Sequence, residues 1–402
     1  EWLGWYRPYI KKWEINIRFW KYKFKKMDKT STLVMNKKFN ISLLPGDGIG
    51  QEISIEATKV LNWFDKFSDL SFVIDEHDIG GVSFDKYESP LTENTLEKIS
   101  KSDAILLGAV GGPKWESLPF ENRPERGLLK IRKELDLFAN FRPAIVFDAL
   151  VDSSSLKPEI IKNLDILIIR ELTSGIYFGE PRGVENIDEK NKRGFNTLEY
   201  TSEEIERIAR VAFETARSRS KRLCSVDKAN VLESTELWRD IIVKTAEKFP
   251  EVELTNMYVD NASMQLVRNP KQFDVIVTTN MFGDILSDCA SMLTGSLGML
   301  PSASIGRKTP NKCNAMYEPV HGSAPDIAGQ GIANPLAMIL SLSMMFKYSL
   351  LKEDYSKVIT RVINKILDNG YRTKDIFNDK DKLISTSDMG DLVVKELNNE
   401  KI

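Results

Sequence analysis

An apolar run that leads into two aspartates constrains the fold of this chain more than any other stretch. Residues 273–279 (FDVIVTT) have the apolar, β-rich composition of a buried parallel strand. Gly283 is expected to break this run, and residues 284–293 then have helical spacing without proline or glycine. The pattern predicts a buried strand that is followed directly by a helix, as in α/β folds.

Asp284 and Asp288 are four residues apart, so a helix places both carboxylates on one face. Like charges at this spacing destabilise a helix by roughly a few tenths of a kcal/mol unless something neutralises them. Hard divalent cations such as Mg²⁺ take oxygen ligands, so the pair is a candidate metal site. A helix cap followed by a solvated aspartate one turn later explains this stretch equally well.

Length and composition bound the class of protein. At 402 residues the chain is long enough for a large core and for more than one domain. Its 42% hydrophobic and 28% charged residues are ordinary globular values and argue against wholesale disorder. A net charge of −2 gives no reason to expect nucleic acid or an anionic membrane as a partner. No apolar run approaches the roughly 20 residues of a transmembrane helix.

The three cysteines, Cys224, Cys289 and Cys313, lack metal-ligand spacing and cannot form a disulfide framework. This usage fits a reducing compartment, and we expect the protein in the cytoplasm. Cys289 is expected to be a small core residue rather than a participant in chemistry. With only two histidines, His77 and His321, the chain cannot build a histidine-rich metal site.

Residues 1–34 differ from the rest of the chain. They hold four of the seven tryptophans, and nine Lys/Arg against three acidic residues. A targeting peptide and a basic amphipathic membrane anchor are two possible interpretations. We expect instead a disordered, non-native or upstream extension without a role in the fold.

A glycine-rich turn follows the predicted strand at 39–44. Its glycines fall at positions 46, 48 and 50, and Gln51 stands where the third glycine of G-x-G-x-x-G belongs. The spacing therefore favours a tight strand-to-helix turn over a standard pyrophosphate-binding loop.

Three arginines stand at the ends of predicted elements: Arg132, Arg142 and Arg170. Each one alone is most simply a surface residue. Arg170 is the exception, because it closes a fully apolar strand, and α/β proteins bind ligands at such ends. Three convergent guanidinium groups would suit a dicarboxylate, since arginine binds carboxylates bidentately.

Further polar residues follow predicted strands. Tyr177 lies in the loop at 172–179. Lys228 comes directly after a strand; a lysine in a turn is usually solvated, but inside a cleft it acts as a base if its pKa is depressed. Asp260 is another strand-end oxygen ligand. The small residues of 321–335 would let a ligand approach backbone N–H groups closely.

Hydrophobic spacing also predicts the regular elements. Helices are expected at 51–64, 92–100, 125–132, 203–218, 284–293, 335–348, 353–368 and 387–398. Strands are expected at 39–44, 72–75, 104–107, 166–169, 223–226, 254–259 and 273–279.

From about Phe39 to its end, the chain resembles the isocitrate/isopropylmalate family of β-decarboxylating dehydrogenases, and within it the enzymes that oxidise 3-isopropylmalate in leucine biosynthesis. The order and spacing of seven motifs carry the resemblance: LLPGDGIG (43–50), GGPKWE (111–116), RELTSGIYFGEPRG (170–183), DKANVL (227–232), NMFGDILSD (280–288), GSLGMLPSAS (295–304) and HGSAPDIAGQGIANP (321–335).

The resemblance implies an α/β fold of two domains with a large mixed sheet, not a Rossmann fold. Residues 35–137 and 295–402 would form the first domain with the NAD-binding loops. Residues 138–294 would form the second, with the metal and substrate residues and the dimer contact.

The resemblance also implies roles for single residues. Asp284 and Asp288 would bind Mg²⁺ or Mn²⁺, joined by Asp260 from the other subunit of a homodimer. Lys228, also from the other subunit, and Tyr177 would transfer protons. The substrate carboxylates would be held by Arg132, Arg142 and Arg170, with Asp260 beside them.

The expected cofactor is NAD. Its contacts would be Gly112, Glu125, His321, Gly322, Ser323, Ala324, Pro325, Asp326 and Asn334. Asp326 matches the position that accepts the adenosine ribose hydroxyls, and its carboxylate would repel the 2′-phosphate of NADP.

An apolar pocket of Leu128, Leu129 and Val231 would accept the isopropyl group of 3-isopropylmalate, while an extra carboxylate buried against leucine is costly. Isocitrate, homoisocitrate and tartrate dehydrogenases are the alternatives within the family. A non-catalytic binding protein with the same fold is a further alternative. Such a protein would lack at least one of the eight residues expected to bind the metal, bind the substrate carboxylates or transfer protons: Asp260, Asp284, Asp288, Arg132, Arg142, Arg170, Lys228 and Tyr177.

Overall fold

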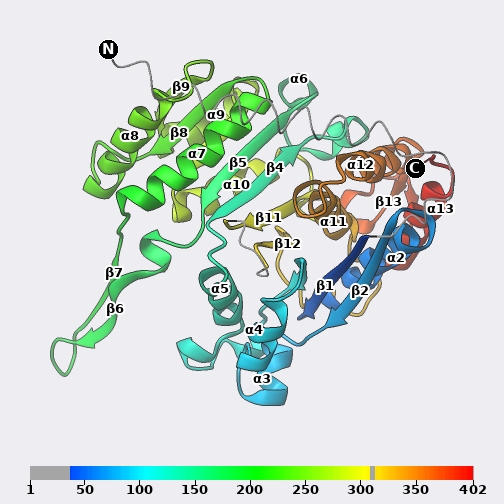
Figure 1. Ribbon diagram of the computed structural model, residues 1–402, viewed down its shortest axis with the longest axis horizontal. Helices are drawn as coiled ribbons and strands as arrows, with labels where there is room; N and C mark the ends of the chain where they lie inside the picture. The colour runs from blue at the N-terminus through cyan, green and yellow to red at the C-terminus, as the bar shows by residue number, and fades with distance from the viewer. Residues whose placement is uncertain (1–36, 308–312, 402) are drawn as a thin grey trace, which may run out of the picture. The chain divides into compact units, whose positions relative to one another are not determined.

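The computed structural model describes residues 37–307 and 313–401, and residues 38–402 form one compact unit. The expectation for residues 1–34 lies outside the described residues. A ten-stranded sheet, in the order β2-β1-β3-β12-β11-β4-β5-β10-β8-β9, runs through the unit (Figure 1). Its strands are β1 (Lys37–Gly46), β2 (Leu70–Glu76), β3 (Ala104–Ala109), β4 (Ala139–Ile145), β5 (Asp165–Glu171), β8 (Arg222–Asp227), β9 (Glu253–Tyr258), β10 (Val275–Thr278), β11 (Pro301–Ile305) and β12 (Ala315–Pro319).

The sheet is mixed, which confirms the expected fold class. β1, β3 and β12 pair in parallel, as do β5, β10, β8 and β9. Between these two blocks β11 pairs antiparallel with β12 and β4, and β4 pairs antiparallel with β5. The boundary between the two expected domains falls at the pairing of β11 with β4. The division into two domains itself stays a prediction.

Each of the eight expected helices is present, and four more occur among the described residues. The α-helices are α2 (Gly50–Phe67), α3 (Gly81–Tyr87), α4 (Glu93–Ile99), α5 (Pro124–Glu134), α6 (Pro158–Ile161), α7 (Ser202–Ser218), α8 (Glu233–Ala246), α9 (Val259–Arg268), α10 (Asn280–Ser291), α11 (Leu336–Tyr348), α12 (Glu353–Asp368) and α13 (Thr386–Leu397). None of the described helices has the length and apolarity needed to cross a membrane.

The expected effect of Gly283 on the chain is wrong. Gly283 does not break the run; it lies inside α10, which begins three residues earlier at Asn280. A Cβ at position 283 would stand 2.7 Å from both Cβ and Cγ of Arg170. The glycine therefore lets the helix pack directly on the arginine at the end of β5.

Several further strands were not expected from the sequence. The central antiparallel strands β4, β11 and β12 were not expected, because β11 in particular is short and rich in serine. Residues 179–197 form a two-stranded hairpin, β6 (Gly179–Asn186) and β7 (Lys192–Thr197), which projects away from the sheet as an arm (Figure 1). A third, two-stranded sheet joins β13 (Tyr371–Arg372) and β14 (Lys382–Leu383).

The two faces of the large sheet are packed differently. On one face a single apolar cluster, which includes Leu106, Phe141 and Val277, extends across both parallel blocks. On the other face there are two separate clusters. One contains Ile168 and Leu286 beneath α10, and the other contains Leu107, Ile131 and Met316 beneath α5. The gap between these two clusters, at the centre of the sheet, is polar.

Candidate active site

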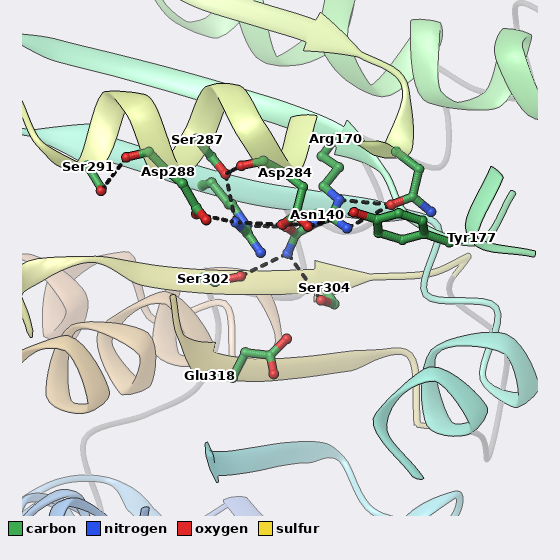
Figure 2. A network of polar contacts seen from close by, with 12 residues as sticks. Asn140, Arg170, Tyr177, Asp284, Ser287, Asp288, Ser291, Ser302, Ser304 and Glu318 are labelled. Carbon is green, nitrogen blue, oxygen red and sulfur yellow. Dashed lines mark hydrogen bonds and ion pairs between the residues drawn. The ribbon is translucent and has the colours of Figure 1, made fainter. Parts of the chain in front are cut away.

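Polar side chains fill the gap between the two apolar clusters (Figure 2). Opposite residues of antiparallel strands share a sheet face, as do residues two apart on one strand. The observed register therefore aligns six polar side chains in two rows across β12, β11, β4 and β5. One row is Arg170, Asn140 and Ser304, and the other is Arg142, Ser302 and Glu318.

Arg170 joins the sheet to α10. Its Nη1 donates to Oδ1 of Asp284, and its Nε and Nη2 donate to Oδ1 of Asn280 at 2.9 and 2.8 Å. The side chain is only 2% exposed. Asn280 begins α10 and Asp284 lies one turn later, so the helix supplies both a neutral and a charged acceptor to this arginine.

Arg142 contacts the next turn of the same helix. Its Nη1 lies 3.3 Å from Oδ1 of Asp288 and 3.4 Å from Oδ1 of Asp284, and it donates to Ser287 Oγ at 2.6 Å. Its Nε donates to Oδ1 of Asn140 at 2.8 Å. Two arginines therefore neutralise the aspartate pair that the helix spacing brings together.

Arg132 lies on α5, opposite α10, and faces the same polar region as Arg142 and Arg170. Its Nη2 donates to Oε1 of Glu318 at 2.6 Å, and both side chains are buried. Its Nε is buried without a hydrogen-bond partner among the described residues. Because a buried N–H without an acceptor is costly, this atom indicates a place for an anionic oxygen of a ligand.

Burial and the surrounding charges together shift the pKa values of the two aspartates in opposite directions. Burial raises the pKa of Asp284, but Arg170 and Arg142 outweigh it and hold that pKa below its ordinary value. Burial raises the pKa of Asp288, opposed by Arg142 and reinforced by the charge of Asp284. Burial also lowers the pKa of Arg170 to about 10, so the guanidinium remains charged at neutral pH.

Tyr177 ends a short turn after β5 and points at the same helix (Figure 2). Its Oη donates to Oδ2 of Asp284 at 2.9 Å, and its ring lies 5.5 Å from the guanidinium of Arg170. Burial, followed by the charge of Asp284, raises the pKa of Tyr177. The phenol therefore stays protonated at neutral pH and can act as a proton donor.

A cavity of about 430 Å³ opens between α5 and α10. It brings together ten of the residues expected from the sequence, some of which come from three separate motifs. They are Glu125, Leu128, Leu129, Arg132, Arg142, Arg170, Tyr177, Asp284, His321 and Gly322.

The donor set at the edge of this cavity fits a hard divalent cation, as expected for Asp284 and Asp288. Both offer carboxylate oxygens from one helix face, and Asp288 is 63% exposed and thus open to a ligand. No group of three or more acidic, histidine or cysteine side chains in the described part of the chain forms a metal site on its own. Two ligands from α10 therefore need further ligands from substrate, water or a second chain.

The expected cofactor residues lie on two adjoining segments. Glu125, His321 and Gly322 line the cavity itself. The His321 ring contacts the Gly322 carbonyl through Nδ1 at 2.8 Å, whereas its Nε2 is buried without a described partner. This orphaned atom fits a polar group of a bound cofactor.

The remaining cofactor residues continue away from the cavity. The Ser323 carbonyl accepts from Ile49 N–H at 2.8 Å, which ties the loop to the glycine-rich turn. A Cβ at Gly48 would stand 2.0 Å from that carbonyl, so the turn serves close packing. Asp326 is exposed, and buried Asn334 donates to Asp375. The other three expected cofactor contacts, Gly112, Ala324 and Pro325, do not line the cavity either.

Lys228, Asp260 and Val231 are not part of the cavity. Lys228 Nζ lies 2.7 Å from Oδ1 of Asp260, which is in the first turn of α9, and Val231 is 62% exposed. The structure of a single chain thus brings the lysine and the aspartate together with each other, but not with the arginines.

Several polar residues of the site were missed from the sequence: Asn140, Asn280, Ser287, Ser302, Ser304 and Glu318. A signal was present in two of the strands. Asn140-Phe-Arg142 and Ser302-Ala-Ser304 alternate polar and apolar residues with the period of a strand that has one polar face.

Comparisons with known proteins agree with this arrangement. The family description "Isocitrate/isopropylmalate dehydrogenase" matches residues 40–393. A 3-isopropylmalate dehydrogenase of Hydrogenovibrio crunogenus is 58% identical over 89% of this chain and 99% of its own length. One of Saccharophagus degradans is 57% identical over 90% of this chain and 100% of its own.

Solved structures show the same fold. An isocitrate dehydrogenase of Methylococcus capsulatus is 33% identical, with a TM-score of 0.79 over 89% of this chain and 99% of that one. A β-decarboxylating dehydrogenase of Thermococcus kodakarensis is 34% identical, with a TM-score of 0.70 over 90% and 96%. The chain belongs to the isocitrate/isopropylmalate dehydrogenase family.

Proposed function

We propose that this chain catalyses the NAD-dependent oxidative decarboxylation of 3-isopropylmalate to 4-methyl-2-oxopentanoate, a step of leucine biosynthesis. The observation that carries the proposal is the meeting of three arginines, two leucines, Tyr177 and Asp284 around one cavity. The names of the relatives at 56–58% identity support the same substrate.

The cavity suits a dicarboxylate with one apolar branch. Arg132, Arg142 and Arg170 present positive charge, and the unpaired Nε of Arg132 is free to donate to a carboxylate. Leu128 and Leu129 supply an apolar wall for the isopropyl group. The third carboxylate of isocitrate would be desolvated against these leucines, which disfavours isocitrate and homoisocitrate as substrates.

Asp284 and Asp288 would hold a divalent cation, which would supply Lewis-acid chemistry at the C2 hydroxyl and its carboxylate. The segment of Glu125, His321 and Gly322 would hold NAD, which would supply the hydride acceptor. The protein's own residues hold the substrate and move the protons. The arginines fix both carboxylates, so that C2 faces the cofactor segment of Glu125, His321 and Gly322.

Two residues carry the proton transfers. Lys228 of a second copy takes the proton of the C2 hydroxyl, directly or through water. After CO₂ has left, Tyr177 gives its phenolic proton to C3, for which its protonated state at neutral pH is suited. Asp284 accepts the hydrogen bond of Tyr177 and so orients the phenol.

A homodimer with shared active sites would bring Lys228, Val231 and Asp260 to the cavity. Exposed apolar side chains support such a contact: Ile285 and Met292 on or beside α10, and Met264 and Val267 on α9, are 45–60% exposed. These helices carry Asp284 and Asp260, so a contact through them would join the two halves of the site.

We expect NAD rather than NADP as the cofactor, with Mg²⁺ or Mn²⁺, and a cytoplasmic location. The exposed carboxylate of Asp326 supports the first point, because it would repel a 2′-phosphate. The three free cysteines fit a reducing compartment. Comparable kcat/KM values with NAD⁺ and NADP⁺ would contradict the cofactor assignment.

The test is Mg²⁺-dependent formation of NADH from 3-isopropylmalate, with isocitrate and tartrate measured in parallel. Faster turnover of isocitrate would overturn the substrate assignment. Lys228→Ala is the control for the base: we expect its kcat to fall by at least ~100-fold, and an unchanged rate would remove Lys228 from the mechanism.

A further inference from the structure

Two asparagines lie behind the arginines of the cavity, and each is fully buried. Asn140 Oδ1 accepts from Arg142 Nε at 2.8 Å. Asn280 Oδ1 accepts from both Nε and Nη2 of Arg170, at 2.9 and 2.8 Å. Both amides thus engage the Nε side of a guanidinium.

The orientation of each side-chain amide is fixed by hydrogen bonds that its Nδ2 donates. Asn140 Nδ2 donates to Ser302 Oγ at 2.8 Å, Ser304 Oγ at 3.2 Å and the Ala303 carbonyl at 3.3 Å, all on β11 (Figure 2). These bonds set the orientation of the amide, so that its oxygen faces the arginine.

Asn280 is fixed in a similar way. Its Nδ2 donates to the Ser174 carbonyl at 3.0 Å, and its backbone N–H donates to Tyr200 Oη at 2.8 Å. The Tyr200 ring is buried against Trp238. A rigid support therefore stands behind Arg170.

Two half-buried arginines elsewhere in the described chain use carboxylates through Nε, whereas buried Arg372 donates through its Nη groups to backbone carbonyls. Arg219 Nε donates to Asp274, and Arg239 Nε donates to Asp227. An amide oxygen accepts the same hydrogen bond without cancelling the charge of the guanidinium. At the two cavity arginines the Nε acceptor is therefore neutral.

The carboxylates that do touch these arginines are Asp284 and Asp288, the expected ligands of the divalent cation. A cation on the aspartates would compete with the Nη1 groups for the same oxygens. The hydrogen bonds from the arginines to Asn140 and Asn280 do not involve the aspartate oxygens. These bonds therefore persist when the aspartates bind the cation instead of the arginines.

We propose that Asn140 and Asn280 are positioning residues of this enzyme: they hold Arg142 and Arg170 in place through their Nε edges without adding a negative charge that would compete with the substrate carboxylates. The proposal rests on the proposed function and adds two residues to it. The proposal has two parts: each arginine needs a hydrogen-bond acceptor at Nε, and that acceptor must be uncharged. The two can be tested separately, because one substitution removes the acceptor and another keeps it but adds a charge.

The first part is tested with Asn140→Leu and Asn280→Leu, which remove the acceptor at similar volume. We expect KM for 3-isopropylmalate to rise at least about tenfold, ~1.4 kcal/mol, in each, because hydrogen bonds to charged groups are worth more than neutral ones. KM for NAD⁺ should stay within about twofold of the unmodified protein. Thr245→Val, a buried hydroxyl loss on α8, is the matched control.

The second part is tested with Asn140→Asp. The hydroxyls of Ser302 and Ser304 can donate to the new carboxylate, so the acceptor and two of its three supporting contacts remain while a negative charge is added. Only the bond to the Ala303 carbonyl is lost. We expect KM for 3-isopropylmalate to rise at least about tenfold here too, because the added charge cancels that of Arg142. This variant also keeps the proposal testable if the leucine variants do not fold.

Calorimetric binding of L-malate, a 2-hydroxy dicarboxylate, is the second readout and needs no turnover. The proposal predicts parallel losses of malate affinity in all three asparagine variants. It is overturned if they bind malate like the unmodified protein. It is also overturned if KM for NAD⁺ rises and thermal stability falls together with the loss of substrate affinity, as a purely structural role would require. An unmodified protein that binds malate but does not oxidise 3-isopropylmalate would instead contradict the proposed function alone.

Discussion

Tyr177 Oη donates a hydrogen bond of 2.9 Å to Asp284 Oδ2, while Oδ1 of the same carboxylate accepts from Arg170. One carboxylate therefore orients both a proton donor and a substrate-binding cation. It also belongs to the aspartate pair that is expected to bind the metal. The position of Asp284 links the three tasks of the site.

The phenol of Tyr177 is the expected general acid. Tyr177→Phe removes the proton but keeps the ring, so kcat for 3-isopropylmalate should fall by about 10²–10⁴-fold with little change in substrate KM. Steady-state NADH formation measures both constants. Tyr348→Phe, outside the cavity, is the matched control and should behave like the unmodified protein. A Tyr177→Phe kcat within about threefold of normal would remove the residue from the chemistry.

Close packing of α10 on β5 depends on Gly283. In Gly283→Ala the new Cβ would stand 2.7 Å from Cβ and Cγ of Arg170, so the helix or the arginine must shift. We expect a loss of ~1–3 kcal/mol in the free energy of unfolding and a higher KM for 3-isopropylmalate. Urea denaturation and initial rates test the two effects. Unchanged stability together with unchanged KM would show that the packing is not needed.

Mg²⁺ binding should stabilise the fold through Asp284 and Asp288. At a concentration of 100 times Kd the gain is ~2.7 kcal/mol, visible as a rise in Tm, and EDTA should abolish turnover. Asp288→Asn should lose most of the Mg²⁺-induced rise in Tm, since one of the two negatively charged carboxylates on α10 is gone. Asp391→Asn, an exposed acid paired with Lys59, is the control. An equal rise in all three proteins would place the cation elsewhere.

His321 should make stability depend on pH. Burial lowers its pKa below the ordinary 6.5, against a smaller opposite effect of the Gly322 carbonyl. Below pH 6.5 the unfolded chain therefore binds a proton that the folded chain resists, and stability falls as the pH falls from there, by at most ~1.4 kcal/mol per pH unit. Urea titrations at fixed protein concentration should show a shallower decline in His321→Asn. Parallel curves for both proteins would refute the contribution.

Local sequence signals predicted the parts of the site that depend on one element. The apolar run before Asn280 predicted β10, and the spacing of Asp284 and Asp288 placed both carboxylates on one helix face. Arg170 was singled out because it closes an apolar strand, and it does line the cavity. Each of these inferences needs only strand or helix periodicity.

The remaining parts depend on contacts between distant segments. Asn140, Ser302 and Glu318 become one polar patch only when β4, β11 and β12 pair, and β11 is too short and too rich in serine to be recognised alone. Gly283 was taken as a break because the arginine against which it packs is 113 positions earlier in the chain.

Lys228 and Asp260 pair with each other in one chain, apart from the cavity. We propose that a second copy supplies both residues to the cavity, so that Asp284→Asn and Lys228→Ala damage different halves of a shared site. The direct measurement is NADH formation from 3-isopropylmalate with Mg²⁺ after the two inactive variants are unfolded, mixed and refolded together. Random association in a two-fold dimer should leave one intact site in each mixed dimer and restore about a quarter of normal activity. No recovery in the mixture, with mixed dimers confirmed by mass spectrometry, would contradict the shared active site.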